Sequence, residues 1–518
     1  MRGSSFIWRA LDRARAINLA EAGAPPPEPG KTDVTRRRVL AAIAGGVGLA
    51  VLPKFPVYAQ SRQSVAIVGG GLAGLAALDE LRNRGVDAVL FEARGATGGR
   101  TRSVQGVFAD NYAFDEGGQL VNTDHADLLG MISRFRIRTV DRRAFGPSHE
   151  VQIGRGGTPV AEARLANSLR AIATRITADS DRLDADYANV AREIDQYSVT
   201  SYLDRHGLAA GDARDALEAA IRTEYGIEPE AASALELLFN LPTVDGRHLN
   251  RISLSDERYL IAGGSEQVAI ALAGQHRQAI RLNRRVTGLD VGNNSARLTF
   301  ADGSRDRFDR VILALPISMA QELNIEGALP TLWRSFFAEV KQGRNEKVIV
   351  GYDNPAWRRT LGYGGTLWAK GQFSAGWDAA SIAPAPGRGA FCYYLGGNEV
   401  AAASGVETAV LAARFTAIAR RGLPGLPNPN GLYRRTRWTE DPLNKGSYVA
   451  FGPGQLSRFA SLFAIEEDGR LQVPQAGPVF IAGEYISDAW PAYMNGALQT
   501  GRIAAQALIA QAARRAAA

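Results

Sequence analysis

The stretch SVAIVGGGLAGLAALDELRNRGVDAVLFEARGATGGRTRS, residues 64–103, decides the fold of this chain. It begins with an apolar, β-branched run at residues 65–68, which predicts a buried parallel strand. Gly69, Gly71 and Gly74 follow with G-x-G-x-x-G spacing, and the pattern after them is that of a helix ending at Gly85. A second apolar run ends at Glu92. This order of strand, glycine turn, helix and strand predicts a Rossmann-like unit.

Each part of this unit has a physical role in holding a dinucleotide. Gly69 permits the tight turn, Gly71 lets the backbone approach a diphosphate, and Gly74 lets the helix pack closely on the strand. The positive N-terminus of the helix faces the diphosphate, and the Glu92 carboxylate can accept hydrogen bonds from ribose hydroxyls. Glycine-rich turns also serve plain packing, but the surrounding strand, helix and acid favour a dinucleotide site.

Further motifs follow in a fixed order along the chain. They are EARGATGGRTRS (92–103), FDEGGQ (114–119), ERYLIAGGSEQVAIALA (257–273), VILALP (311–316) and GPVFIAGEYISDAWPAYMNGALQTGRIAAQAL (477–508). In this arrangement the chain resembles the flavin-containing amine oxidases, the family of monoamine oxidases, polyamine oxidases and L-amino-acid oxidases. The resemblance implies an α/β fold with FAD as the cofactor.

The resemblance also assigns residues to the cofactor. Relatives hold the adenine by backbone contacts at the position of Val286. Monoamine oxidases carry a cysteine that links covalently to FAD, but this chain has Ser447 there, so we predict noncovalent FAD. The predicted cofactor-binding residues are Gly69, Gly71, Gly74, Glu92, Arg94, Gly99, Arg100, Gly118, Gln119, Val286, Trp438, Gly483, Glu484, Met494 and Ala497.

Three residues are predicted to act in catalysis. RNEKVIVGYDNPAWRR (344–359) resembles the strand in which relatives carry a lysine that holds a water at the flavin, and here that residue is Lys347. The plainer interpretation is a strand lysine that faces solvent. Tyr448 and Tyr493 match the two aromatic walls between which relatives hold the amine, so we expect them to desolvate and align the substrate. Trp490 is left open between packing and lining the entrance.

An amine and an amino acid are both candidate substrates. Snake-type L-amino-acid oxidases grip the substrate carboxylate with an arginine at the position of Leu120, so that clamp is missing. Arg100, Arg102, Arg142 or Arg143 could supply another, although most arginines are solvated surface groups.

The domains are expected to be discontinuous. Residues 62–125, 250–325 and 436–512 are predicted to form the Rossmann-like FAD-binding domain. Residues 126–249 and 326–435 are predicted to form an α+β substrate-binding domain with a helical part. Apolar residues recur with helical spacing in the first segment, and the second segment contains strand-like apolar runs.

Residues 1–59 are predicted to be a leader with a signal peptide. Arg36 and Arg37 form a twin arginine, the apolar run 39–52 is too short to span a membrane, and Ala59 fits a cleavage site. The stretch before Asp33 is expected to be disordered. We therefore predict folded export by the twin-arginine machinery to the periplasm or outside a bacterial cell; an ordinary secretion signal is the alternative.

The remaining signals narrow the function classes. Residues 1–59 carry +5 of the net charge of +7, which argues against a nucleic-acid partner. The five histidines lack metal-ligand spacing, so no metal is predicted, and His125 is expected at a helix cap or on the surface. Oxygen and a periplasmic electron carrier remain alternative electron acceptors. A desaturase or isomerase of an apolar substrate is a weaker alternative function. A homodimer is one option for the assembly.

Overall fold

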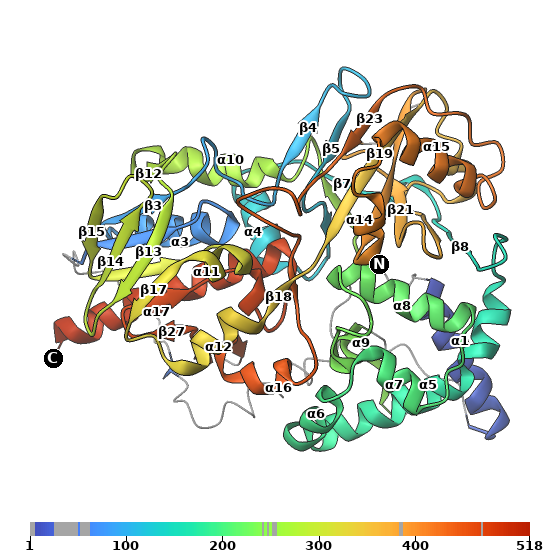
Figure 1. Cartoon of the computed structure of the whole chain (residues 1–518), viewed down its shortest axis with the longest axis horizontal. Coiled ribbons are helices and arrows are strands. Elements are labelled where there is room, and N and C mark those ends of the chain that lie inside the picture. Colours follow the sequence, from blue (N-terminus) through green and yellow to red (C-terminus); the bar gives the residue numbers. More distant parts are fainter. Residues whose placement is uncertain are drawn as a thin grey trace.

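The computed structural model describes residues 6–24, 50–51, 63–240, 243–245, 248–250, 256–382, 387–467 and 470–517. Figure 1 shows two main parts side by side. On one side lie the glycine-turn helix α3 (Leu72–Asn83), the C-terminal helix α17 (Met494–Ala517) and the sheets between and around them. On the other side lie a strongly bent sheet around β19 (Asn345–Tyr352) and a group of helices below it.

A six-stranded sheet forms the core of the first part, in the order β12-β3-β2-β16-β28-β27. Its first five strands run parallel, and β27 pairs antiparallel at the edge. Segments far apart in sequence meet here, since Leu313 pairs with both Val68 and Ile481. The strands are β2 (Val65–Val68), β3 (Ala88–Phe91), β12 (Ile280–Arg281), β16 (Arg310–Leu313), β27 (Gln475–Ala476) and β28 (Val479–Ile481).

Two long helices of this part pack against each other at small residues. A Cβ on Gly501 of α17 would lie 2.1 Å from the carbonyl oxygen of Ala73 in α3, so only glycine allows the approach. A second sheet, in the order β15-β14-β13-β17, lies beside the core sheet in Figure 1. Its strands are β13 (Val286–Val291), β14 (Ala296–Phe300), β15 (Arg305–Phe308) and β17 (Asn324–Gly327).

The second part combines an antiparallel sheet with a helical group. The sheet has the order β21-β22-β19-β23, and every residue of β19 is buried. This burial follows from its position between two partner strands and under α15 (Thr408–Ala419), whose Leu411 and Phe415 are fully buried. The other strands are β21 (Ala375–Asp378), β22 (Gly389–Gly396) and β23 (Tyr433–Arg435), and the helices below are α5 (Glu162–Ala185), α6 (Tyr187–Asp195), α7 (Val199–Arg205), α8 (Asp212–Tyr225) and α9 (Ala234–Asn240).

Shorter elements connect the two parts and complete their surfaces. They are β4 (Ser103–Gln105), β5 (Ala113–Asp115), β6 (Leu120–Val121), α4 (Ala126–Arg134), β7 (Thr139–Asp141), β8 (Glu150–Ile153), β9 (Thr243–Asp245), β10 (His248–Asn250), β11 (Tyr259–Ile261), α10 (Glu266–Gln275), α11 (Ile317–Glu322), α12 (Thr331–Glu339), β18 (Lys341–Gln342), α13 (Trp357–Thr360), β20 (Thr366–Ala369), α14 (Asn398–Ala403), β24 (Val449–Ala450), α16 (Gln455–Phe459), β25 (Ile465–Glu467) and β26 (Arg470–Gln472).

The start of the chain differs from the expected disordered leader. Residues 6–21 form helix α1 (Phe6–Glu21), which packs along α5 (Figure 1). Its buried Ile7, Ala10, Leu11 and Ala14 recur at the spacing of one helix face, a signal that the sequence interpretation passed over. Asn18 adds hydrogen bonds to the Arg170 carbonyl and the Thr174 hydroxyl of α5, each 2.9 Å long. The disorder prediction was therefore wrong for residues 6–21.

The predicted export signal lies largely outside the described residues. The twin arginine and most of the apolar run fall within residues 25–49 and 52–62, which the structure does not describe. The short strand β1 (Ala50–Val51), at the end of that run, pairs antiparallel with β26. In the described part of the chain, no helix is both long and apolar enough to cross a membrane.

The packing of α1 on α5 makes a testable prediction. In the full-length chain, Leu11→Ala should lower the free energy of unfolding by about 2 to 4 kcal/mol, since a fully buried leucine side chain is removed. Urea unfolding followed by circular dichroism measures the change. Arg13→Ala, at an exposed position of the same helix, is the matched control and should leave the midpoint unchanged. Equal midpoints for the two variants would show that α1 does not stabilise the fold.

Candidate active site

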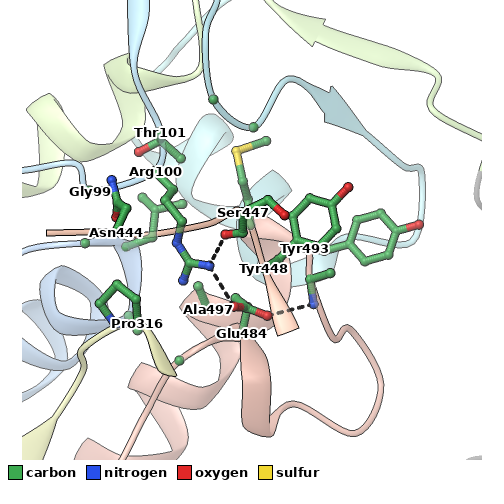
Figure 2. A pocket seen from close by; sticks show the side chains of 18 of the residues that line it. Gly99, Arg100, Thr101, Pro316, Asn444, Ser447, Tyr448, Glu484, Tyr493 and Ala497 are labelled. Atoms are coloured by element: carbon green, nitrogen blue, oxygen red, sulfur yellow. Dashed lines mark hydrogen bonds and ion pairs between the residues drawn. The ribbon is translucent and has the colours of Figure 1, made fainter. Parts of the chain in front are cut away.

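One continuous cavity of about 480 Å³ runs between the two main parts. It is lined by all the predicted site residues except Gly74, which lies behind the glycine turn. The predicted cofactor-binding residues thus meet around one space, together with Lys347, Tyr448 and Tyr493. Figure 2 shows part of this lining, including Gly99, Arg100, Glu484 and the two tyrosines.

The glycine turn has the geometry that a diphosphate requires. Gly69 adopts φ +109°, and a Cβ on Gly74 would lie 1.9 Å from the carbonyl oxygen of Gly69. Gly71 is the N-cap of α3, no side chain caps this end, and a Cβ at Gly71 would meet open space. The first N–H groups of α3 therefore begin at the cavity wall, where a helix N-terminus attracts an anion.

The acid that follows this unit is held by backbone donors. The Glu92 carboxylate accepts hydrogen bonds from the N–H groups of Gly70 and Arg94, each 2.7 Å long, and it still lines the cavity. Arg94 forms an ion pair of 2.6 Å with Asp441. Gly99 adopts φ +58° beside Gly71, which brings the second glycine turn against the first.

An arginine and a glutamate link three distant segments beside this turn (Figure 2). Arg100 donates to the Ser447 carbonyl and forms an ion pair of 2.8 Å with Glu484. The other oxygen of Glu484 accepts from the Ala492 N–H at 3.1 Å. The Ser447 hydroxyl donates to the side-chain oxygen of Asn345 at 2.7 Å, so this hydroxyl is engaged within the protein.

The remaining predicted cofactor residues come from connecting segments and from two elements, β13 and α17. Trp438 donates to the Glu116 carbonyl at 3.1 Å and has the Arg102 guanidinium over its ring. Gly118 faces Met494 so closely that a Cβ would lie 3.0 Å from the methionine side chain. The other members also line the cavity, namely Gln119, Val286 at the start of β13, Gly483 with φ +149°, and Ala497 in the first turn of α17.

Lys347 does not face solvent, which excludes the plainer interpretation of this residue. Its side chain is buried on β19, and its ammonium donates to the carbonyls of Asp115 and Gly117 at 2.7 and 2.8 Å. It also lies 3.4 Å from the side-chain oxygen of Gln119. Burial lowers the pKa of Lys347. The lysine thereby ties the FDEGGQ loop to β19; its role in holding a water stays a prediction.

The two predicted tyrosine walls are held by different neighbours. The Tyr448 hydroxyl donates to the Thr223 carbonyl at 2.8 Å and lies 2.7 Å from the Tyr394 hydroxyl. Burial raises the pKa of Tyr448 and of Tyr394, so both phenols stay neutral. Tyr493 precedes α17, and Figure 2 shows its ring beside that of Tyr448.

His125 occupies the N-cap position of α4, which agrees with the expected helix cap in position only. Its side chain caps no N–H group of the helix, and it is not exposed, so the surface alternative was wrong. Its ring is fully buried and lies edge-on to Trp490 and Tyr493, with centroid distances of 5.0 and 5.1 Å. Burial lowers its pKa to about 3, so the imidazole is neutral. Trp490 is buried and does not line the cavity, which identifies it as a packing residue behind Tyr493.

The four arginines considered as carboxylate clamps are already engaged. Arg100 pairs with Glu484, Arg102 with Glu116, and Arg143 with Asp256. Arg142 lines the cavity, but its guanidinium donates to two carbonyls and lies 3.6 Å from the Glu257 carboxylate.

Sequence reasoning missed several residues of the cavity wall. Trp377 and Tyr394, whose ring centroids are 5.2 Å apart, come from β21 and β22. Thr223 and Glu224 come from the last turn of α8. None of these residues belongs to a motif. The sequence does not show whether an aromatic residue in a strand, or an acid in a helix, lines a cavity or lies on the surface.

Comparison with known proteins agrees with this geometry. Residues 72–509 match the family described as flavin containing amine oxidoreductase. A protein of Mycobacterium tuberculosis assigned as a flavin-containing monoamine oxidase is 26% identical over 468 residues, covering 85% of this chain and 95% of its own. The flavin-containing amine oxidase B of Cavia porcellus is 23% identical over 470 residues, covering 87% of this chain and 86% of its own.

Solved structures share the fold. Wild-type putrescine oxidase bound to putrescine superposes with a TM-score of 0.72 at 22% identity, covering 86% of this chain and 99% of its own. Cyclohexylamine oxidase from Brevibacterium oxydans gives a TM-score of 0.73 at 21% identity, covering 88% and 100%. The predicted α/β flavoenzyme fold and the FAD cofactor are thus confirmed. With more than four-fifths of its length matched, the chain belongs to the flavin-containing amine oxidoreductase family.

Proposed function

We propose that this enzyme oxidises a primary or secondary amine by hydride transfer to noncovalent FAD. The products are an imine, which water hydrolyses to an aldehyde or ketone plus ammonia or an amine, and hydrogen peroxide from oxygen. The observation that carries the proposal is that Tyr448, Tyr493 and Lys347 line the same cavity as the dinucleotide-type glycine turn.

The residues present fit FAD. The uncapped N-terminus of α3 and the open side of Gly71 suit the diphosphate, and Glu92 suits the ribose. When bound, FAD supplies the acceptor for a hydride from the carbon next to the amine nitrogen. Ser447 has no sulfur for a thioether, which supports a noncovalent cofactor.

The protein groups prepare the amine. Between the rings of Tyr448 and Tyr493 an amine loses its water, which favours the uncharged form from which hydride transfer is easiest. Because their surroundings keep the phenols of Tyr448 and Tyr394 neutral, these groups orient the substrate and do not remove a proton. Lys347 holds the loop that ends at Gln119, beside the same space.

Amines are favoured over amino acids as substrates. A carboxylate-binding site needs an arginine with free donors aimed into the cavity. Three of the candidate arginines instead pair with Glu484, Glu116 and Asp256, and the fourth, Arg142, lies beside Glu257. The names of the similar solved proteins, a putrescine oxidase and a cyclohexylamine oxidase, also support an amine.

Folded export remains part of the proposal on sequence grounds. The twin arginine and the short apolar run support transport by the twin-arginine route to the periplasm or outside the cell. In that compartment a soluble electron carrier could replace oxygen as the acceptor. A homodimer stays a prediction.

A substrate panel tests the proposed reaction. Purified holoenzyme is mixed with amines and L-amino acids, and bleaching of the flavin without oxygen is compared with peroxide formation in air. We expect bleaching and peroxide with amines and neither with amino acids. Bleaching without peroxide would assign the enzyme to the dehydrogenases that reduce a carrier. No bleaching by any amine would contradict the proposal and favour a desaturase or isomerase.

The mode of FAD binding can be tested separately. Acid precipitation of the yellow protein should leave the flavin in the supernatant, because Ser447 cannot form a thioether. Absorbance of pellet and supernatant measures the partition. Colour retained by the pellet would contradict noncovalent binding.

Replacement of the two tyrosine walls tests the cage. Tyr448→Ala and Tyr493→Ala should each lower kcat/KM for the best amine by roughly 10- to 1,000-fold, because the amine is then neither aligned nor desolvated. FAD content, from absorbance, should stay unchanged. Tyr433→Ala, a half-buried tyrosine of β23 outside the cavity, is the control. Unchanged turnover in both wall variants would refute the cage assignment.

A further inference from the structure

The cavity contains a carboxylate that the proposed chemistry does not use. Glu224 lies in the last turn of α8 and lines the cavity. Among the described residues, its carboxylate has no hydrogen-bond or ion-pair partner within bonding distance. Burial, with the nearby Glu257 adding to it, raises its pKa to about 7. An acid inside a protein without a partner is costly unless a ligand compensates its charge.

The charges near Glu224 do not cancel. Glu257 also lines the cavity and lies 3.6 Å from Arg142, which therefore balances Glu257. Glu236 is a third acid of the lining, but its carboxylate accepts the Phe451 N–H and burial raises its pKa to about 8. Of these three acids, Glu224 is therefore the one whose negative charge no described protein group balances.

Glu224 is next to the predicted cage. The carbonyl of its neighbour Thr223 accepts the hydroxyl of Tyr448, the predicted wall. Glu224 lines the same cavity as Tyr448 and Tyr394, and its negative charge adds to burial in raising the pKa of both phenols. The rings of Tyr394 and Trp377, whose planes are tilted by 56°, supply an apolar surface along the same cavity. A ligand there would pass an apolar stem along aromatic rings and end at a carboxylate.

We propose that Glu224 binds a second cationic group of the substrate, so that the preferred substrate is an aliphatic diamine or polyamine. This inference rests on the proposed amine oxidation. One amine loses its charge between Tyr448 and Tyr493, and the other keeps its ammonium and pairs with Glu224. The same carboxylate repels the carboxylate of an amino acid, which adds a reason for its exclusion.

Paired substrates test the role of Glu224. Holoenzyme is assayed with straight-chain α,ω-diamines and with n-alkylamines of the same carbon number. Glu224→Gln keeps the shape and removes the charge, so kcat/KM for the best diamine should fall by roughly 10- to 100-fold, mainly through KM, while that for the n-alkylamine stays the same. Glu224→Asp should keep the diamine preference. Glu230→Gln, an exposed acid five residues beyond α8, is the matched control.

Binding is measured apart from turnover. Titration calorimetry on dithionite-reduced holoenzyme, which cannot oxidise an amine, should show a diamine Kd raised by the same factor in Glu224→Gln. FAD absorbance and the thermal midpoint show that the variant is folded. Equal losses for both substrate classes, or no loss for either, would overturn the inference while amine oxidation stands. Failure of the wild type to oxidise any amine would instead overturn the proposed function.

Discussion

The close approach of α3 to the turn after β2 is the contact on which the rest of the site depends. With the Gly74 Cβ position 1.9 Å from the Gly69 carbonyl oxygen, any side chain there would push the helix off the sheet. Helix α17 in turn packs on α3 through Gly501, and Tyr493 directly precedes α17. Two contacts that need glycine therefore fix both the cradle for the diphosphate and one wall of the predicted amine cage.

The polar groups of the cavity are organised by pairing and burial. Near the glycine turn, Arg100 and Glu484 neutralise each other while joining segments that are far apart in sequence. In the middle, the environment of Tyr448 and Tyr394 keeps their phenols neutral, and Lys347 is held by carbonyls. Glu224 differs from these groups because no described residue compensates its charge, which is why its partner is sought in the substrate.

Several features of the fold and the site could be predicted because they are local. The spacing of Gly69, Gly71 and Gly74 specifies a backbone conformation, and the apolar runs around it specify a buried parallel strand pair. The later motifs were recognised by resemblance, and their residues do gather around one cavity. The helical face of Ile7, Ala10, Leu11 and Ala14 was also a local signal, but the surrounding leader pattern hid it.

The sequence alone determined the dinucleotide-type turn, the family and the absence of a cysteine at position 447, because each depends on residue identity at fixed spacing. Only the tertiary structure decided the states of Lys347, His125 and Glu224. Whether a polar side chain faces solvent, packs in the core or lines a cavity depends on neighbours from distant segments, such as the carbonyls of Asp115 and Gly117 that hold Lys347. Folding brings those neighbours together, so the residues adjacent in sequence do not indicate which contacts a side chain makes.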